Sequence, residues 1–294
     1  MKKFLTRILI ITIAPIILFT ILNVFYYKLG NHTRLSAFEV YDAIDVSGTE
    51  TDYTTLILGD SVGRQFFSPE YQEESEVCCY LATNQAITVA GNYILFRRFL
   101  ENNPDIDRIY YVLRPDSLKS SVNFVYTYSY FVTPLFNGSY NTYLHPETVE
   151  GIEEVFGKVC AERAFPKWMM AKYPKILEMY NSSCSTLWQM RHQGGSVEQM
   201  PDMAITYLYD MKQMCDEYGI ELHLICVPLP DGYAFDFESL EKEMDAAGLE
   251  TLYEEYVYDV QYVDRDAFVD GIHLTKEYLD ENREKYIGNI LQLK

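Results

Sequence analysis

The chain has 294 residues, which is enough for one large domain or two modest ones. Hydrophobic residues make up 48% of it, charged residues 23% and aromatic residues 15%. This composition excludes collagen-like, low-complexity and wholly disordered proteins. The formal net charge of −19 would repel a phosphate backbone, so we expect no nucleic acid partner.

The N-terminal segment has the composition of a membrane-spanning helix. Twenty residues from Ile8 to Tyr27 carry no charge, and as a helix they would extend about 30 Å, the thickness of a bilayer's hydrocarbon core. A buried core helix is the alternative, although the run shows no polar face. Three basic residues precede the run and one follows it, which places the N-terminus in the cytoplasm.

The residues at the end of this run indicate whether a signal peptidase would cleave it. Residues 23–27 have large side chains where a signal peptidase needs small ones, so we predict an uncleaved anchor over residues 1–28. The rest of the chain would then lie outside the cytoplasm, held at the cell membrane by a single helix. We interpret the polar residues 29–53 as a stalk, and residues 54–294 as the folded domain.

The folded domain alternates between strand and helix patterns. Short apolar runs bounded by turn residues predict strands at 54–58, 77–81, 108–113 and 221–227. Apolar residues at helical spacing predict helices at 87–102, 203–218, 236–256 and 275–293, with residues 257–263 extended. Thr275 is the predicted N-cap of the last helix. Such alternation predicts a parallel sheet covered on both faces, with ligands at the carboxyl ends of its strands.

The alternation breaks between about residues 117 and 201. Residues 124–143 are crowded with Tyr, Phe and Asn and show no clean period. We interpret this segment as an insertion that roofs the site. Its aromatic residues could form a small satellite core or a platform on which sugars stack.

The cysteines and histidines show no metal-binding pattern. Six cysteines are too few for a disulfide scaffold. Four of them lie in apolar or helical segments and are predicted to be buried free thiols: Cys78, Cys79, Cys215 and Cys226. Cys160 and Cys184 are the pair that could form a disulfide. No Cys-x-x-Cys occurs and the five histidines are scattered, so we expect no structural zinc and no cofactor.

Two short segments could carry chemistry. Gly59-Asp60-Ser61 follows the first predicted strand, at a turn that exposes the serine beside helix-start amides able to stabilise an oxyanion. Asp270-Gly271-Ile272-His273 directly precedes the last helix. A serine nucleophile needs a base, and an imidazole base needs a carboxylate to orient it. Each segment alone also fits a purely structural role. The first could be a helix cap, and the second a loop histidine capped by a local aspartate.

Together the two segments resemble the SGNH (GDSL-type) hydrolase superfamily. That family has a strand followed by Gly-Asp-Ser near the domain's start and Asp-x-x-His near its end. The resemblance covers residues 54–294 apart from the insertion, and it implies a three-layer α/β/α sandwich with a mainly parallel, flavodoxin-like sheet. It also implies that Ser61 is the nucleophile, His273 the general base and acid, and Asp270 the orienting carboxylate.

The family's glycine block after the second strand is altered in this chain. That block supplies an amide which joins the serine amide in the oxyanion hole. Asn84-Gln85-Ala86 stands in its place, so the resemblance points to the amides of Ser61 and Ala86, with Gly91 as an alternative and Asn84 as a further candidate.

The family's Gly-x-Asn-Asp block after the third strand is altered as well. It reads Leu113-Arg114-Pro115-Asp116 here, without the asparagine that donates a third hydrogen bond. Loss of one such donor can lower turnover by about 10² to 10³. Arg114 and Arg64 are the candidates to replace it.

The anchor and the outward-facing domain are similar to the branch of the family used in cell-envelope acylation. That branch includes the D-alanyl-lipoteichoic acid and alginate acetylation proteins, which work beside a membrane-bound O-acyltransferase. The resemblance implies that Ser61 forms an acyl-enzyme and passes the acyl group to an envelope glycan or to water. The alternative is a degenerate domain that binds a glycan or a partner protein without turnover.

Overall fold

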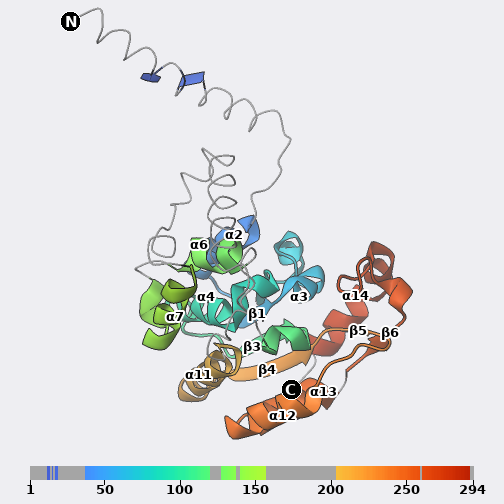
Figure 1. Cartoon of the computed structure of the whole chain (residues 1–294). Helices are drawn as coiled ribbons and strands as arrows, with labels where there is room; N and C mark the ends of the chain where they lie inside the picture. The colour runs from blue at the N-terminus through green and yellow to red at the C-terminus, as the bar shows by residue number, and fades with distance from the viewer. Residues whose placement is uncertain are drawn as a thin grey trace, which may run out of the picture.

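A four-stranded parallel sheet forms the centre of the protein, for which we obtained a computed structural model (Figure 1). The structure describes residues 12, 13, 15, 17, 18, 37–119, 127–136, 140–156, 203–258 and 260–291. The order of the strands across the sheet is β2-β1-β3-β4. Their bounds agree with the predicted strands: β1 Thr55–Gly59, β2 Cys78–Tyr80, β3 Arg108–Leu113 and β4 Glu221–Cys226.

Helices cover both faces of the sheet, as the alternating pattern predicts (Figure 1). On one face α2 and α11 pack against α4, and on the other α14 packs against α3 while α13 packs against β4. The bounds on the first face are α2 Phe38–Ser47, α4 Thr88–Asn102 and α11 Met203–Tyr218. Those on the second face are α3 Ser61–Phe66, α13 Glu250–Tyr258 and α14 Lys276–Leu291. The fold is therefore an α/β sandwich of three layers.

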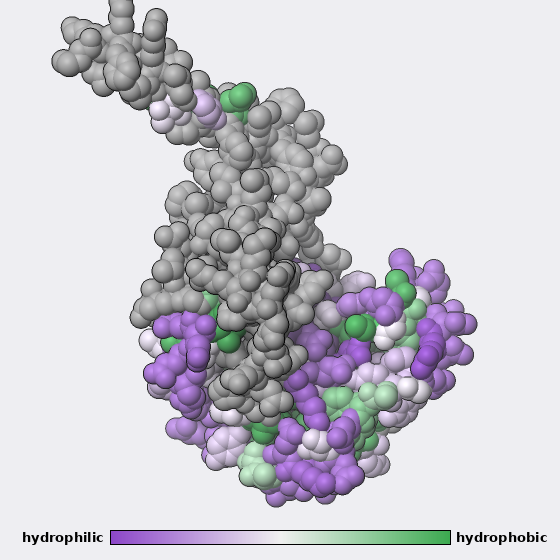
Figure 2. All heavy atoms as spheres, in the orientation of Figure 1, coloured by the Kyte–Doolittle hydropathy of each residue, from purple (hydrophilic) through white to green (hydrophobic). Residues whose placement is uncertain are grey.

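The core lies in the sheet and the helix faces turned toward it. Leu56, Ile57 and Leu58 of β1 are all fully buried, because both faces of a parallel sheet are covered. Hydrophilic residues predominate on the described part of the face shown in Figure 2, and hydrophobic ones occur there in small groups. Cys78, Cys79, Cys215 and Cys226 are buried free thiols, as predicted. Cys160 and Cys184 lie outside the described residues.

The segment that we interpreted as a stalk is partly folded onto the domain. Helix α2 lies within residues 29–53, and its residues Val40, Ala43 and Ile44 are buried in the core. The guanidinium of Arg98 in α4 donates to the Ile44 carbonyl at 3.1 Å and to the Ser47 hydroxyl at 3.2 Å. The helical spacing of these apolar residues is masked in the sequence by the acidic residues between them.

The predicted helix over residues 236–256 is wrong in one respect, because the structure divides it in two. Helix α12, Phe237–Ala246, is separated from α13 by Gly248, whose φ of +72° lies in the left-handed region. That conformation ends a helix, and glycine adopts it without steric cost. Helix α13 then continues to Tyr258, further than the sequence predicted.

The C-terminal part contains two further short strands. Strands β5, Leu229–Pro230, and β6, Tyr262–Val263, form a separate parallel pair. The last helix begins where the sequence predicted, since the backbone N–H of Tyr278 donates to the Thr275 hydroxyl at 3.2 Å. Thr275 is therefore the N-cap of α14, as predicted.

The described parts of the predicted insertion pack on the core. Phe131, Leu135 and Phe136 are fully buried, which favours the satellite core over a sugar-stacking platform for these side chains. Elements of this region are η4 Tyr128–Val132, α6 Thr133–Leu135, η5 Tyr140–Tyr143 and α7 Pro146–Phe156. The remaining short helices are η1 Pro69–Glu74, η2 Gln85–Ile87, η3 Pro115–Lys119 and η6 Arg265–Ala267.

The predicted membrane anchor, residues 8–27, falls almost entirely outside the described residues. Among the helices that the structure does describe, none combines the length and the apolar character needed to cross a bilayer.

The turn between β1 and α3 is held by a buried carboxylate. Asp60 is only 2% exposed. Its Oδ1 accepts from the backbone N–H groups of Val62 at 2.9 Å and Gly63 at 3.0 Å, which caps α3. Its Oδ2 accepts from the backbone N–H of Arg114 and from the Ser117 hydroxyl, both at 2.8 Å. One side chain therefore joins the turn after β1 to the turn after β3.

Replacement of Asp60 by asparagine should strongly destabilise the protein. Only one of the two terminal atoms of the asparagine amide can accept hydrogen bonds, whereas both carboxylate oxygens of Asp60 accept them. At least one buried N–H therefore loses its partner, and we expect the free energy of unfolding to fall by about 2 to 4 kcal/mol. Asp236→Asn is the matched control, because Asp236 caps α12 with one exposed hydrogen bond and asparagine caps equally well. Chemical unfolding followed by circular dichroism measures both. Equal losses in the two variants would contradict the role given to Asp60.

Candidate active site

The position of Ser61 is set by close packing of backbone. Ser61 is the first residue of α3, directly beyond the carboxyl end of β1. A Cβ atom at Gly59 would lie 2.4 Å from the Val112 carbonyl oxygen of β3, and one at Gly63 would lie 2.3 Å from it. Both residues must therefore be glycine for β1 and α3 to approach β3 this closely. As a result the serine is held at the carboxyl edge of the sheet.

His273 brings a base to this serine from the other end of the chain. Its Nε2 lies 3.0 Å from Ser61 Oγ, and its Nδ1 lies 2.8 Å from Asp270 Oδ2. An ionised carboxylate only accepts hydrogen bonds, so Nδ1 carries the hydrogen and Nε2 of the neutral ring can accept the serine proton. The structure thus brings Ser61, His273 and Asp270 together in one hydrogen-bonded chain.

The turn around Asp270 keeps that carboxyl ionised. Its Oδ1 accepts from the backbone N–H groups of His273 at 2.8 Å and Ile272 at 2.9 Å. The backbone and then the side chain of His273 are the main causes that lower the pKa of Asp270 from 3.8 to about 2. A permanent negative charge beside the ring orients the imidazole and stabilises its protonated form.

The loop that carries His273 is fastened to α3 by Gln65. Its side-chain amide donates to the Leu274 carbonyl at 2.9 Å, and its side-chain oxygen accepts from the Leu274 backbone N–H at 2.9 Å. Residue 274 also bridges to Phe268, which closes the loop on itself. Sequence reasoning missed Gln65, because its partner is backbone 209 positions away and no local pattern signals it.

Ser61 and His273 open into a pocket of about 460 Å³. Its lining is mostly polar, and the residues are Glu39, Ser61, Arg64, Gln65, Ser68, Tyr71, Thr83, Asn84, His273 and Leu279. None of the described residues of the predicted insertion is among them, so those residues do not roof the pocket. A polar pocket of this size admits a small polar group next to the serine.

Two of the predicted oxyanion donors fit the structure. The Ser61 backbone N–H is the first of α3, and the first N–H groups of a helix have no acceptor within it. Asn84 lines the pocket, and its side-chain oxygen accepts from the Ala86 backbone N–H at 2.9 Å. That bond orients the Asn84 amide, and within the described residues its NH₂ group has no hydrogen-bond partner.

Three of the other candidates, Ala86, Gly91 and Arg114, are not positioned for this role, whereas Arg64 lines the pocket. The Ala86 amide is already used by Asn84. Gly91 lies inside α4, where a Cβ atom would meet Ile87 and Leu135 at 3.0 Å, so it serves helix packing. The Arg114 guanidinium pairs with Asp116 at 2.8 Å and lies over the Tyr233 ring, outside the residues that line the pocket.

Other histidines in the described residues also pair with carboxylates. His145 lies 2.5 Å from Asp210, and His223 lies 2.5 Å from Glu255. Among these three described histidines, however, only His273 has a serine hydroxyl within hydrogen-bonding distance. A nucleophile next to an oriented base is the arrangement that covalent catalysis requires.

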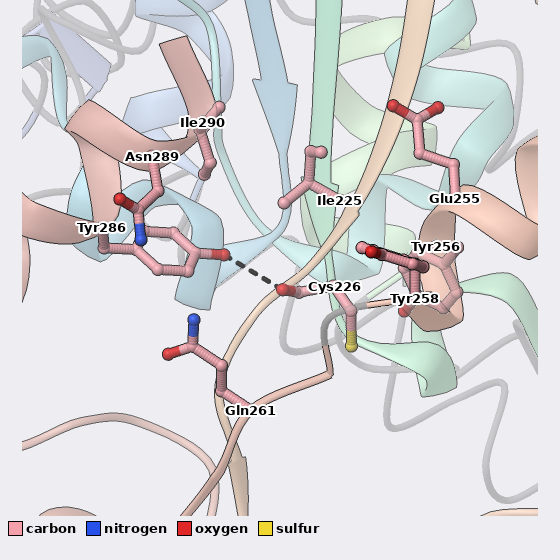
Figure 3. Close-up of a pocket in the computed structure, with 9 residues that line it drawn as sticks. All are labelled: Ile225, Cys226, Glu255, Tyr256, Tyr258, Gln261, Tyr286, Asn289 and Ile290. Atoms are coloured by element: carbon pink, nitrogen blue, oxygen red, sulfur yellow. Dashed lines mark hydrogen bonds between the residues drawn. The ribbon is translucent and has the colours of Figure 1, made fainter. Parts of the chain in front are cut away.

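A second pocket, of about 170 Å³, lies between the end of β4 and helices α13 and α14 (Figure 3). The Tyr286 hydroxyl on α14 donates to the Cys226 carbonyl at 3.0 Å, which joins α14 to the strand (Figure 3). Burial raises the pKa of the Cys226 thiol to about 12, so this thiol stays protonated and unreactive. The second pocket is therefore not a candidate for nucleophilic chemistry.

Loss of the Gln65 fastening should reduce the reactivity of Ser61 more than it reduces stability. In Gln65→Ala the loop can shift, and we expect the rate of reaction with a fluorophosphonate to fall about ten- to a hundredfold. Gln72→Ala is the matched control, because the Gln72 side chain also makes two hydrogen bonds to backbone, to the Cys78 carbonyl and from the Tyr80 N–H. Both variants should lose similar stability in thermal unfolding. Equal rates in the two would show that Gln65 does not position His273.

The Asp270 carboxyl should titrate far below an ordinary aspartate. We expect a midpoint near pH 2 for its carboxyl carbon in an NMR titration, because two backbone N–H groups and the imidazole stabilise the charged form. In His273→Ala the side-chain bond is lost and the pKa of Asp270 should move up toward 3.8. Since the folded pKa is lowered, the stabilisation is complete above pH 4 and disappears as the pH falls toward 2. A midpoint unchanged by His273→Ala would contradict the pairing.

Comparison with known proteins leaves the family open. No family model matches the chain, and a search of curated proteins finds no match. A solved structure from Streptococcus pneumonia, described only provisionally as a platelet activating factor, aligns with 87% of this chain and 92% of its own at a TM-score of 0.39 and 12% identity. The proposal for function therefore rests on the geometry around Ser61.

Proposed function

We propose that this protein is a serine esterase or O-acyltransferase of the SGNH type, which cleaves an ester bond through an acyl-enzyme on Ser61. The observation that carries the proposal is the hydrogen-bonded chain from Asp270 through His273 to Ser61. Its two ends come from opposite ends of the folded domain. A protein without turnover has no physical need for a serine, a base and an orienting carboxylate in this order.

The first half-reaction uses His273 as base and then as acid. Ser61 Oγ attacks the ester carbonyl carbon while its proton passes to His273 Nε2, and the imidazolium is stabilised by Asp270. The negative charge that develops on the carbonyl oxygen is stabilised by the Ser61 amide and the Asn84 side-chain amide. The tetrahedral intermediate then collapses, and His273 returns the proton to the departing alcohol.

The second half-reaction reverses these steps with a new hydroxyl. His273 takes the proton from that hydroxyl, whose oxygen attacks the acyl-enzyme and releases Ser61. Water as the attacking group makes the protein an esterase, and a glycan hydroxyl makes it an acyltransferase. The His273 side chain is 39% exposed and that of Asp270 is 51% exposed, which gives either acceptor a path to the acyl group.

Further parts of the proposal rest on the sequence. The charge-free run over residues 8–27 supports an N-terminal membrane anchor, with the catalytic domain outside the cytoplasm. The resemblance to envelope acylation proteins supports an acylated envelope glycan or another acyl donor as substrate. It also supports a membrane-bound O-acyltransferase as the partner that works beside this protein.

A second candidate function is binding without turnover, by a degenerate domain that acts as an accessory to a glycan or a partner protein. One observation favours it. Where the family carries an asparagine donor, this chain has Pro115, and the guanidinium of the neighbouring Arg114 is engaged with Asp116. The oxyanion hole would then lack one donor of three, which lowers turnover by about 10² to 10³ without abolishing it.

Labelling of the full-length protein with a fluorophosphonate distinguishes the two functions. We expect rapid labelling of the wild type, none in Ser61→Ala, and a rate lower by about 10² to 10⁴ in His273→Ala, because the serine loses its base. His145→Ala is the matched control, since it removes a histidine from another carboxylate pair and should leave labelling unchanged. Absence of labelling in a folded wild type, or labelling that persists in Ser61→Ala, would refute the esterase and favour the binding function.

A further inference from the structure

Arg64 lines the pocket that contains Ser61, and no described residue pairs with its charge. It lies on α3 three positions after the serine, so the two side chains share one face of the helix. Both line the pocket. Within the described residues the Arg64 guanidinium makes no ion pair and no hydrogen bond, and its Nε is buried without an acceptor. Arg108 and Arg114, by contrast, both pair with carboxylates.

This lack of a partner is unusual in so acidic a chain. The protein has a net charge of −19, so carboxylates are abundant on it. A half-buried guanidinium loses part of its hydration, and the loss is normally offset by hydrogen bonds to an acceptor. Arg64 lines the pocket, and its two terminal NH₂ groups are not among the buried atoms that lack a partner. The missing acceptor can therefore come from a bound molecule.

A second unsatisfied group lies in the same pocket. Thr83 is 1% exposed, and its hydroxyl is buried with no hydrogen-bond partner in the described part of the chain. A hydroxyl can donate to an oxyanion beside a guanidinium. Glu39 is the one carboxylate among the lining residues, and it makes no ion pair with Arg64. The pocket thus holds an unpaired cation and a spare donor next to the nucleophile.

We propose that Arg64 binds an anionic group carried by the substrate, so that the pocket selects esters bearing a carboxylate or a phosphate near the reacting carbonyl. The inference rests on the proposed function of Ser61. A planar guanidinium binds either oxyanion through two parallel hydrogen bonds, which a lysine cannot reproduce. Selection of a charged substrate follows from Arg64, whereas the chemistry follows from Ser61 and His273.

The test compares anionic esters with neutral ones in the full-length protein. The charge lies on the acyl portion in mono-4-nitrophenyl adipate and on the alcohol portion in 4-acetoxyphenyl phosphate. Their neutral counterparts are 4-nitrophenyl hexanoate and 4-methoxyphenyl acetate. The quantity measured is the ratio of kcat/KM for each anionic ester to that for its counterpart. The ester with the higher ratio tells which portion of the substrate carries the anion.

We expect a ratio above one in the wild type for at least one pair. That ratio should fall about ten- to a hundredfold in Arg64→Gln, and less in Arg64→Lys, which keeps the charge but loses the paired geometry. Lys276→Gln removes the same charge from an exposed position near the site, and it should leave the ratio unchanged. A ratio that does not change in Arg64→Gln overturns the inference. An equal loss on both esters also overturns it, because Arg64 would then act as an oxyanion donor.

Binding to an inactive variant separates this inference from the proposed function. Calorimetric titration of Ser61→Ala with 4-acetoxyphenyl phosphate should show binding that weakens about ten- to a hundredfold in the Ser61→Ala, Arg64→Gln double variant. If the wild type hydrolyses no ester but this difference is found, the proposed function fails and the anion site stands. If neutral esters are hydrolysed and neither measurement depends on Arg64, the function stands and the anion site fails.

Discussion

The buried carboxylate of Asp60 is the interaction on which the site depends. It accepts four hydrogen bonds, two from the first turn of α3 and two from the turn after β3. A buried charge is tolerated only when such donors replace its hydration. If the two turns separated, the carboxylate would either become exposed to water or stay buried without hydrogen-bond donors. Gly59 and Gly63 allow the same turns to touch. Ser61 directly follows Asp60 and is the first residue of α3. Its position is consequently fixed by the fold itself.

His273 lies on a loop that directly precedes α14. His273 and Asp270 lie on a surface segment, and both are partly exposed. Two contacts join this loop to α3: the hydrogen bond between His273 and Ser61, and the pair of hydrogen bonds between Gln65 and the backbone of Leu274. Ser61 is therefore positioned by the sheet, whereas His273 is brought to it by a surface loop. The position of Ser61 thus depends on buried contacts of the sheet, whereas that of His273 depends on contacts at the surface.

The proposed preference of the pocket for anions rests on the charge of one side chain, Arg64. Most of the surface of so acidic a protein repels anions, and the guanidinium of Arg64 provides a local exception beside the reacting serine. If the anchor and the anion site both act as proposed, the substrate is a charged ester presented close to the membrane. The short distance between Arg64 and Ser61 along α3 would then align the ester carbonyl with the nucleophile.

Local patterns in the sequence were enough to predict much of the fold. The four strands, the helices at 88–102 and 203–218 and the Thr275 cap all follow from periodicity and capping within a few residues. The Asp270–His273 pair is equally local, because both residues lie on one turn. Local patterns failed at α2, whose apolar face is hidden among acidic residues, and at Gly248, which divides α12 from α13.

Only the tertiary structure decided which polar groups remain available. The amide of Ala86 and the guanidinium of Arg114 are both engaged by neighbours, whereas Asn84 and Arg64 face the pocket. Gln65 meets Leu274 across 209 positions, and no periodicity in the chain encodes that contact. The sequence by itself was thus enough to single out Ser61, His273 and Asp270, because each lies in a short motif, and the structure brings the three side chains together. The donors and cation around them depend on which hydrogen bonds the folded chain has already made, and that is decided by contacts between distant segments.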